Sequence, residues 1–202
     1  ASSKLGAEVE SGRGVFHQAS LKTLPLDDES VDAVLVNQVL HHVADEPEQN
    51  WPSHQRIFAE FARVLKPGGI VTINSCSHAQ LRSGFWFYHL IPDAIERICE
   101  RTCDPATMAS LLKAAGFGET KHAVDSGIVM QDASYFKAEG VFDTDWRSGD
   151  SIWALVAPDE LEAALGKARE LAETGELQSF MKQHDAPRSE VGQLTFSLSK
   201  KI

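Results

Sequence analysis

The chain has few cysteines and no long apolar run. Its 202 residues include only Cys76, Cys99 and Cys103, and an odd, small number does not support a disulfide framework. No apolar segment approaches the roughly 20 residues that span a bilayer. The polar N-terminus lacks the basic and apolar regions of a signal peptide. We therefore expect a cytoplasmic protein with no membrane partner.

Basic residues are also scarce. The chain has 19 Lys and Arg against 29 Asp and Glu, which gives a net charge of −10. A negative surface repels phosphates, so nucleic acid and anionic membranes are disfavoured as partners. Hydrophobic residues make up 43% of the chain, as in an ordinary globular domain. The composition predicts a single domain over residues 1–202 that acts on a small molecule.

Residues 24–74 predict a strand, a helix and a second strand. Residues 31–36 are a short apolar run, interrupted only by Asp32, as expected of a buried strand. Residues 53–65 carry apolar side chains at the spacing of one helical face. The Lys-Pro-Gly-Gly sequence that follows ends this helix, because proline cannot continue it and glycine allows the turn. Ile70 then begins the second strand.

Further elements alternate in the same way, which predicts an α/β fold with a parallel sheet. Expected strands lie at residues 15–19, 119–130 and 194–199, and expected helices at residues 104–116, 158–175 and 176–184. The last strand alternates apolar Leu194, Phe196 and Leu198 with Thr195, Ser197 and Ser199. This pattern predicts that the Thr and Ser side chains form the wetter face.

This order of turn, strand, polar tip with histidines, helix, Lys-Pro-Gly-Gly and strand resembles the centre of class I S-adenosylmethionine (SAM) methyltransferases of the small-molecule branch. The resemblance covers residues 15–125 and, more loosely, the last strand. It implies a Rossmann-like methyltransferase sheet with helices on both faces and the strand order 3-2-1-4-5-7-6. In that order residues 15–19 would be strand three, 31–36 strand four and 70–74 strand five. Residues 119–125 would be strand six and 194–199 the antiparallel strand seven.

The first part of the family pattern has no counterpart in the chain. Only 23 residues precede Leu24, and none form a strand followed by a glycine-rich loop. We therefore expect an N-terminally incomplete fold that lacks strands one and two, with residues 1–14 as a polar remnant. Strand four would then be an exposed apolar edge. This predicts a homo-oligomer or a complementing N-terminal segment, and a chain that is inactive or incomplete by itself.

The resemblance implies SAM as cofactor and four residues that would contact it. Ser20 occupies the slot where the family commonly has an Asp that accepts from the adenine amino group. Leu21 matches the apolar residue that packs on the adenine. Asn37 and Gln38, at the tip of strand four, match positions beside the methionine portion.

His41 and His42 are the candidate catalytic residues. The resemblance places them where His42 could face the methyl group, and histidine can accept a proton near neutral pH. The alternative is that one begins a helix and the other is exposed. Some relatives carry a metal-binding Glu-x-x-Glu-His here, but Gln38 is a poor metal ligand, so we expect no metal.

Phe85, Trp86 and Tyr88 follow strand five, where the family often builds a substrate lid. They could form an aromatic wall for an acceptor, or they could simply pack a helical insertion onto the sheet. Residues 78–103 and 128–190 are the two variable insertions that would supply such a lid or cover.

The leading hypothesis is therefore SAM-dependent methyl transfer to a small organic acceptor. The alternative is a non-catalytic methyltransferase-like scaffold or partner subunit that pairs through the edge of strand four. A nicotinamide-dependent enzyme of similar architecture fits less well, because the chain has no dinucleotide-binding glycine fingerprint.

Overall fold

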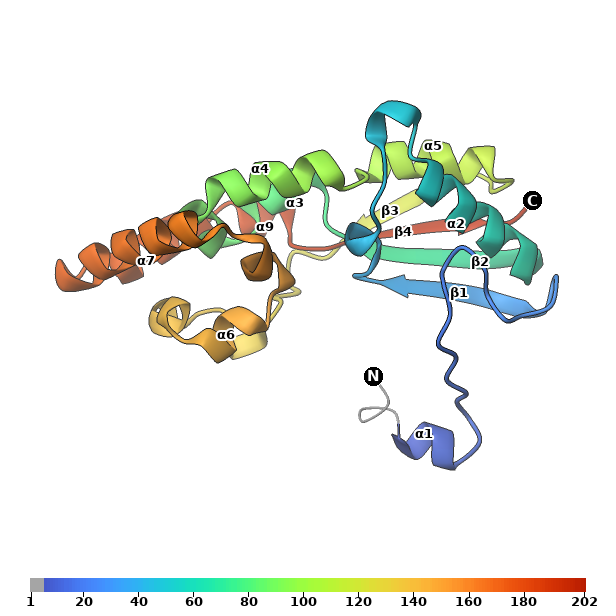
Figure 1. Ribbon diagram of the computed structural model, residues 1–202, viewed down its shortest axis with the longest axis horizontal. Helices are drawn as coiled ribbons and strands as arrows, with labels where there is room; N and C mark the ends of the chain where they lie inside the picture. Colours follow the sequence, from blue (N-terminus) through green and yellow to red (C-terminus); the bar gives the residue numbers. More distant parts are fainter. Residues whose placement is uncertain (1–5) are drawn as a thin grey trace.

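The sheet has four strands, arranged in the order β1-β2-β4-β3 (Figure 1). The computed structural model describes residues 6–202, so the first five residues of the predicted polar segment lie outside the described residues. The strands are β1 (Val31–Asn37), β2 (Leu65–Ser75), β3 (Lys121–Val124) and β4 (Thr195–Lys200). β1 and β2 are parallel, whereas β4 is antiparallel to both β2 and β3. The sheet thus confirms the predicted 4-5-7-6 half of the order, including the antiparallel last strand.

The Lys-Pro-Gly-Gly segment follows the central helix, as predicted, and lies within β2 as a bulge. Only Leu65 separates helix α2 (Pro52–Val64) from this segment, and Gly68 adopts a φ of +80°, which glycine tolerates best. β2 pairs with β1 at Leu65 and again from Ile70, so the four intervening residues loop out opposite Asp32. The Lys66 ammonium donates to the Asp32 carboxylate at 2.8 Å across this bulge.

Two helices cover one face of the sheet. Helix α2 packs on β2, and α5 (Pro105–Ala114) packs on β4 beside it. Asp104 caps α5 by accepting from Ala106 N at 3.1 Å, and Gly116 follows the helix with a φ of +96°, as the sequence predicts. Between helices and sheet lies a core that includes Ile57, Phe58, Phe61, Val71, Ile73 and Leu112.

The prediction of helices on both faces differs from the structure. In the part of the chain that the structure describes, the opposite face is open: Leu35 is 70% exposed, Ile70 44% and Leu198 38%. These side chains share one face through the β1–β2 and β2–β4 registers. The sheet therefore presents an apolar surface that no described helix covers.

The prediction that the Thr and Ser side chains of the last strand form its wetter face was wrong. Thr195, Ser197 and Ser199 are 4%, 0% and 3% exposed, because β4 turns them toward the helices. Each hydroxyl has a partner there: Gln80 Oε1 accepts from Thr195, and His122 and Thr120 contact Ser197 and Ser199. Hydrogen bonding satisfies these polar atoms inside the protein, which alternation alone cannot reveal.

The predicted strand at residues 15–19 was also wrong. These residues follow the short helix α1 (Gly6–Glu10) without regular structure, and Val15 and Phe16 are 77% and 45% exposed. No described strand lies beside them to accept their backbone hydrogen bonds, so the segment does not enter the sheet.

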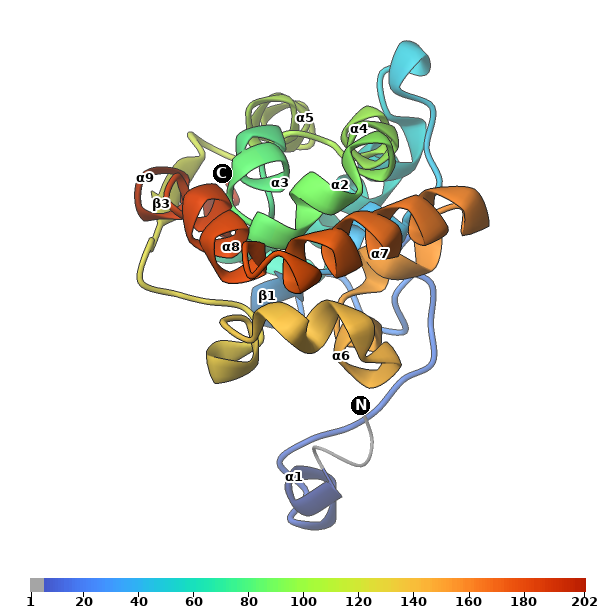
Figure 2. The same cartoon turned by 90° about the vertical axis from the view of Figure 1, so that its left-hand side faces the viewer.

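The two predicted insertions form a separate helical part at one end of the sheet, on the left in Figure 1 and facing the viewer in Figure 2. It has its own core, centred on Phe85, Trp86, Phe87, Tyr135 and Ile152. Its α-helices are α3 (His78–Ser83), α4 (Pro92–Arg101), α6 (Thr144–Ser148), α7 (Pro158–Glu173), α8 (Leu177–Asp185) and α9 (Arg188–Val191). Its 3₁₀ turns are η3 (Trp86–Leu90), η4 (Asp132–Ser134), η5 (Ala138–Phe142) and η6 (Ser151–Leu155). Two more, η1 (Leu40–His42) and η2 (Pro47–Gln49), lie between β1 and α2.

Candidate functional site

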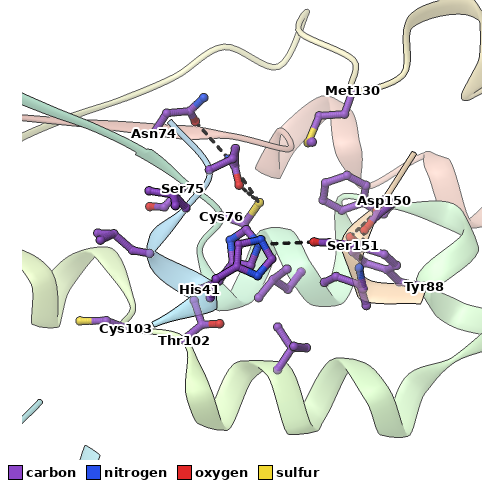
Figure 3. A pocket seen from close by; sticks show the side chains of 18 of the residues that line it. His41, Asn74, Ser75, Cys76, Tyr88, Thr102, Cys103, Met130, Asp150 and Ser151 are labelled. Carbon is purple, nitrogen blue, oxygen red and sulfur yellow. Dashed lines mark hydrogen bonds between the residues drawn. The ribbon is translucent and has the colours of Figure 1, made fainter. Parts of the chain in front are cut away.

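A cavity of about 320 Å³ lies between the ends of β1 and β2 and the helical part (Figure 3). One wall comes from residues 38–42, which follow β1, and from residues 74–76 at the end of β2. The opposite wall is formed by Phe85, Tyr88 and residues 148–152 of the helical part. Parallel strands end at the same edge of a sheet, which is where α/β proteins form their ligand crevices.

The polar tip of β1 is held to β2 by side-chain amides. Gln38 turns the chain with a φ of +49°, and its backbone N–H donates to Asn74 O at 3.0 Å. Asn74 Nδ2 donates to Asn37 Oδ1 at 2.7 Å, while Gln38 Nε2 donates to Asn74 Oδ1 at 3.2 Å. The two strand ends are thereby fixed relative to one another at the cavity.

His41 and His42 lie in η1 and both line the cavity. Their rings are 4.0 Å apart, and His41 Nε2 is 3.4 Å from Ser151 Oγ on the opposite wall. Burial, with a smaller contribution from His42, lowers the pKa of His41 to about 4. The His41 imidazole is therefore neutral at physiological pH and a weaker base than an ordinary histidine.

His54 is a further histidine on this wall, which the sequence did not single out. Its Nδ1 lies 2.5 Å from Asp45 Oδ2, and both side chains are 1% exposed. The Asp45 carboxylate also accepts from the backbone N–H groups of Glu46, Ser53 and His54. Burial opposes ionisation, but hydrogen bonds from His54 and from these amides outweigh it and lower the pKa of Asp45. An ionised Asp45 accepts a hydrogen bond from Nδ1 and so fixes the orientation of the His54 ring.

Asp150 is the carboxylate on the opposite wall. Its Oδ2 accepts from the Tyr88 hydroxyl at 2.7 Å, and its Oδ1 accepts from Ile152 N at 2.9 Å, which caps η6. Burial raises the pKa of Asp150, and the two hydrogen bonds offset this only in part. Burial, followed by the Asp150 charge, also raises the pKa of Tyr88, so the phenol stays protonated.

Three buried polar atoms of residues on the cavity wall have no hydrogen-bond partner within the protein: His54 Nε2, Ser75 Oγ and Thr102 Oγ1. Buried polar atoms are normally satisfied, so their clustering on one cavity indicates a place for polar ligand groups. Cys76 lies on the same wall, and burial, followed by the Asp150 charge, raises the pKa of its thiol to about 12. The thiol is therefore neutral and not activated as a nucleophile.

Only two of the three aromatic residues proposed to contact the acceptor lie at the cavity. Phe85 and Tyr88 line the cavity, with ring centroids 4.5 Å apart. Trp86 points into the helical core instead, is fully buried, and donates from Nε1 to Tyr135 O at 2.9 Å. Part of this aromatic segment thus forms a cavity wall, and part of it packs the helical insertion.

The four residues proposed for the cofactor lie in two places. Asn37 and Gln38 stand at the tip of β1, where Gln38 lines the cavity. Ser20 is exposed and does not line the cavity, and its Oγ accepts from Lys22 N at 3.2 Å within a tight turn. Leu21 is half-buried against the core between sheet and helices.

Within residues 6–202 no group of three or more His, Cys, Asp and Glu side chains is arranged to hold a metal ion. Cys99 and Cys103 are buried in different cores, because α4 ends between them. None of the described helices combines the length and apolar character needed to cross a membrane.

Two kinds of comparison relate the chain to known proteins. A family model described as a methyltransferase domain matches residues 2–73. A solved structure from Anabaena variabilis, described as a methyltransferase of an antibiotic biosynthesis pathway, superposes with a TM-score of 0.71 at 18% identity. That match covers 96% of this chain and 78% of the other. A Galdieria sulphuraria structure, described as a sarcosine dimethylglycine methyltransferase, gives a TM-score of 0.51 at 19% identity. The match covers 98% of this chain but 64% of that one, so the chain spans less than two thirds of its length.

Proposed function

We propose that this chain, a member of the class I SAM-dependent methyltransferase family, forms the acceptor side of a site for methyl transfer to a small organic molecule. The observation that carries the proposal is the position of the cavity. It opens at the carboxyl ends of two parallel strands and is closed by a helical part with aromatic side chains. Alignment of the reactants in such a water-poor space supplies much of the rate enhancement in a displacement reaction.

The methyl donor of this family is SAM, which supplies a methyl group on a sulfonium when bound. We infer that Asn37 and Gln38 contact its methionine portion, and that Ser20 and Leu21 contact its adenine. The described residues fit only part of this cofactor, because none of them forms a strand with a glycine-rich loop before β1. The chain by itself is thus expected to bind the cofactor weakly and to be inactive or incomplete.

Histidines on the cavity wall can accept the proton that a protonated acceptor must lose. His41 and His42 are the catalytic candidates from the sequence, and His41 is neutral because of its lowered pKa. His54 is a third candidate, since Asp45 orients its ring and leaves Nε2 without a partner. Phe85 and Tyr88 form the aromatic wall against which the acceptor packs.

Calorimetric titration with S-adenosylhomocysteine tests the proposal. We expect the folded chain to bind it with a Kd of about 0.1–1 mM, as a partial site would. Gln38→Ala should weaken binding several-fold, because Gln38 fixes the tip of β1 at the cavity. Gln55→Ala is the control, since Gln55 is an exposed glutamine on α2 that does not line the cavity. A folded chain that gives no heat at millimolar ligand would contradict the proposal.

A second candidate is a non-catalytic scaffold or partner subunit that pairs through β1. It is favoured by the open apolar face of the sheet and by the position of β1, which pairs only with β2 among the described strands. Unpaired strand edges readily accept another chain.

If a second copy covers this surface, light scattering should give the mass of a dimer. Leu35→Lys should then shift the chain toward monomer, because Leu35 is 70% exposed on the open face of the edge strand β1. Asp32→Lys, also on β1 but outside the apolar surface, is the matched charge control. A wild-type monomer at high concentration would count against self-pairing.

A further inference from the structure

The cavity has an unusual balance of charge. Among the described residues that line it there is no Lys or Arg. The His41 imidazole, the Cys76 thiol and the Tyr88 phenol are all held in their neutral forms by burial. Asp150 is therefore a carboxylate in a cavity whose lining includes histidines but no Lys or Arg.

Asp150 has hydrogen-bond donors but no cation. The Tyr88 hydroxyl and Ile152 N occupy one lone pair on each oxygen, at 2.7 and 2.9 Å. No ion pair within residues 6–202 includes Asp150, whereas most other partly buried acids of the chain have an Arg, Lys or His partner. A carboxylate removed from water without a counter-ion is costly, and each of its oxygens can accept one more hydrogen bond.

We propose that Asp150 recognises the ammonium group of a cationic amine, so that the acceptor of this site is a small arylalkyl amine. The inference rests on the proposed function and names its substrate class. An ammonium beside Asp150 supplies both the missing charge and N–H donors. An anionic acceptor is disfavoured, because its carboxylate or phosphate would meet the Asp150 charge and no Lys or Arg lines the wall to hold it.

The neighbouring side chains suit such a ligand. Phe85 and Tyr88 form an adjacent ring pair on the wall that carries Asp150, and aromatic faces attract cations as well as apolar groups. The opposite wall holds the neutral His41 imidazole. A neutral imidazole there places no like charge opposite the ammonium group.

Binding of two isosteres tests the inference directly. The probes are 2-phenylethylamine and 2-phenylethanol, titrated separately into the full chain by calorimetry at pH 7. We expect the amine to bind at least tenfold more tightly than the alcohol. In Asp150→Asn the ratio of the amine affinity to the alcohol affinity should fall to about one. The Kd of the alcohol should change little. Asp143→Asn is the matched control, because Asp143 caps α6 as Asp150 caps η6 but does not line the cavity.

Several outcomes would overturn the inference. These are equal binding of the two probes, an amine preference that survives in Asp150→Asn, and no binding of either probe by a chain whose circular dichroism shows it to be folded. Tighter binding of 3-phenylpropanoate than of the amine would also overturn it. A loss of S-adenosylhomocysteine binding in Asp150→Asn, with amine binding unchanged, would assign the carboxylate to the cofactor instead. Failure of S-adenosylhomocysteine to bind the wild type would count against the proposed function. The amine titration tests recognition by Asp150 independently of cofactor binding.

Discussion

Replacing Asp45 with alanine is expected to lower the free energy of unfolding by about 3–5 kcal/mol, because it leaves several buried N–H donors without their acceptor. The Asp45 carboxylate accepts four hydrogen bonds, three from backbone amides and one from His54 Nδ1. Two of those amides begin α2, so the variant also loses the acceptor at the helix N-terminus. Urea denaturation of the wild type and the variant measures the difference.

The effect should depend on pH in a defined direction. Because the pKa of Asp45 is lowered in the folded chain, its stabilisation is present above the unfolded pKa of about 3.9 and is lost as the pH falls through the folded value. The wild type and Asp45→Ala should therefore converge in stability in acid. Asp32→Ala, which removes an exposed ion pair with Lys66, should cost under about 1 kcal/mol. A loss for Asp45→Ala no larger than that of Asp32→Ala would show that the Asp45–His54 contact is not formed in solution.

Replacing Trp86 with alanine is expected to cost about 3–5 kcal/mol, as large-to-small changes of buried aromatic residues do. Trp86 is fully buried among Phe87 and Trp146, and its Nε1 donates to Tyr135 O. Trp86→Phe should cost less, because it keeps an aromatic ring and loses mainly the hydrogen bond and part of the volume. Thermal and urea unfolding provide the measurements.

The same variants separate a structural role from an acceptor-binding one. Trp86 does not line the cavity, so folded Trp86→Phe should bind 2-phenylethylamine as the wild type does. Tyr88→Phe is the comparison, because it removes the hydroxyl that donates to Asp150 at the cavity. Amine binding that falls in Trp86→Phe without loss of stability would place Trp86 in the acceptor site after all.

Much of the sheet could be predicted from the sequence, because its signals are local. The apolar run of β1, the helical periodicity of α2 and the Lys-Pro-Gly-Gly segment lie within residues 31–73 and fix one parallel strand pair. The orientation of β4 could not be predicted in this way. Alternation shows that two faces differ but does not show which one the helices cover, and here partners such as Gln80 satisfy the polar face.

The sequence pointed to residues that line the cavity only where those residues lie close together in the chain. Gln38, His41 and His42 follow one strand, and they do line the cavity. Their counterpart Ser151 is 110 residues away from His41, and Asp150 meets Tyr88 across 62 residues. No short-range pattern links such pairs. Asp150 before Ser151-Ile152 does carry a helix-capping signal, which alone predicts a structural role rather than a place on a cavity wall.

The most direct test of the central claim is to follow the S-adenosylhomocysteine titration by NMR with assigned backbone amides. A site at the ends of β1 and β2 predicts that the amides of residues 37–42 and 74–77 shift progressively, with smaller changes at residues 148–152. Amides on α7, which lies outside the cavity, should not move. Shifts confined to other surfaces, or none in a folded chain at millimolar ligand, would contradict the assignment of this cavity to methyl transfer.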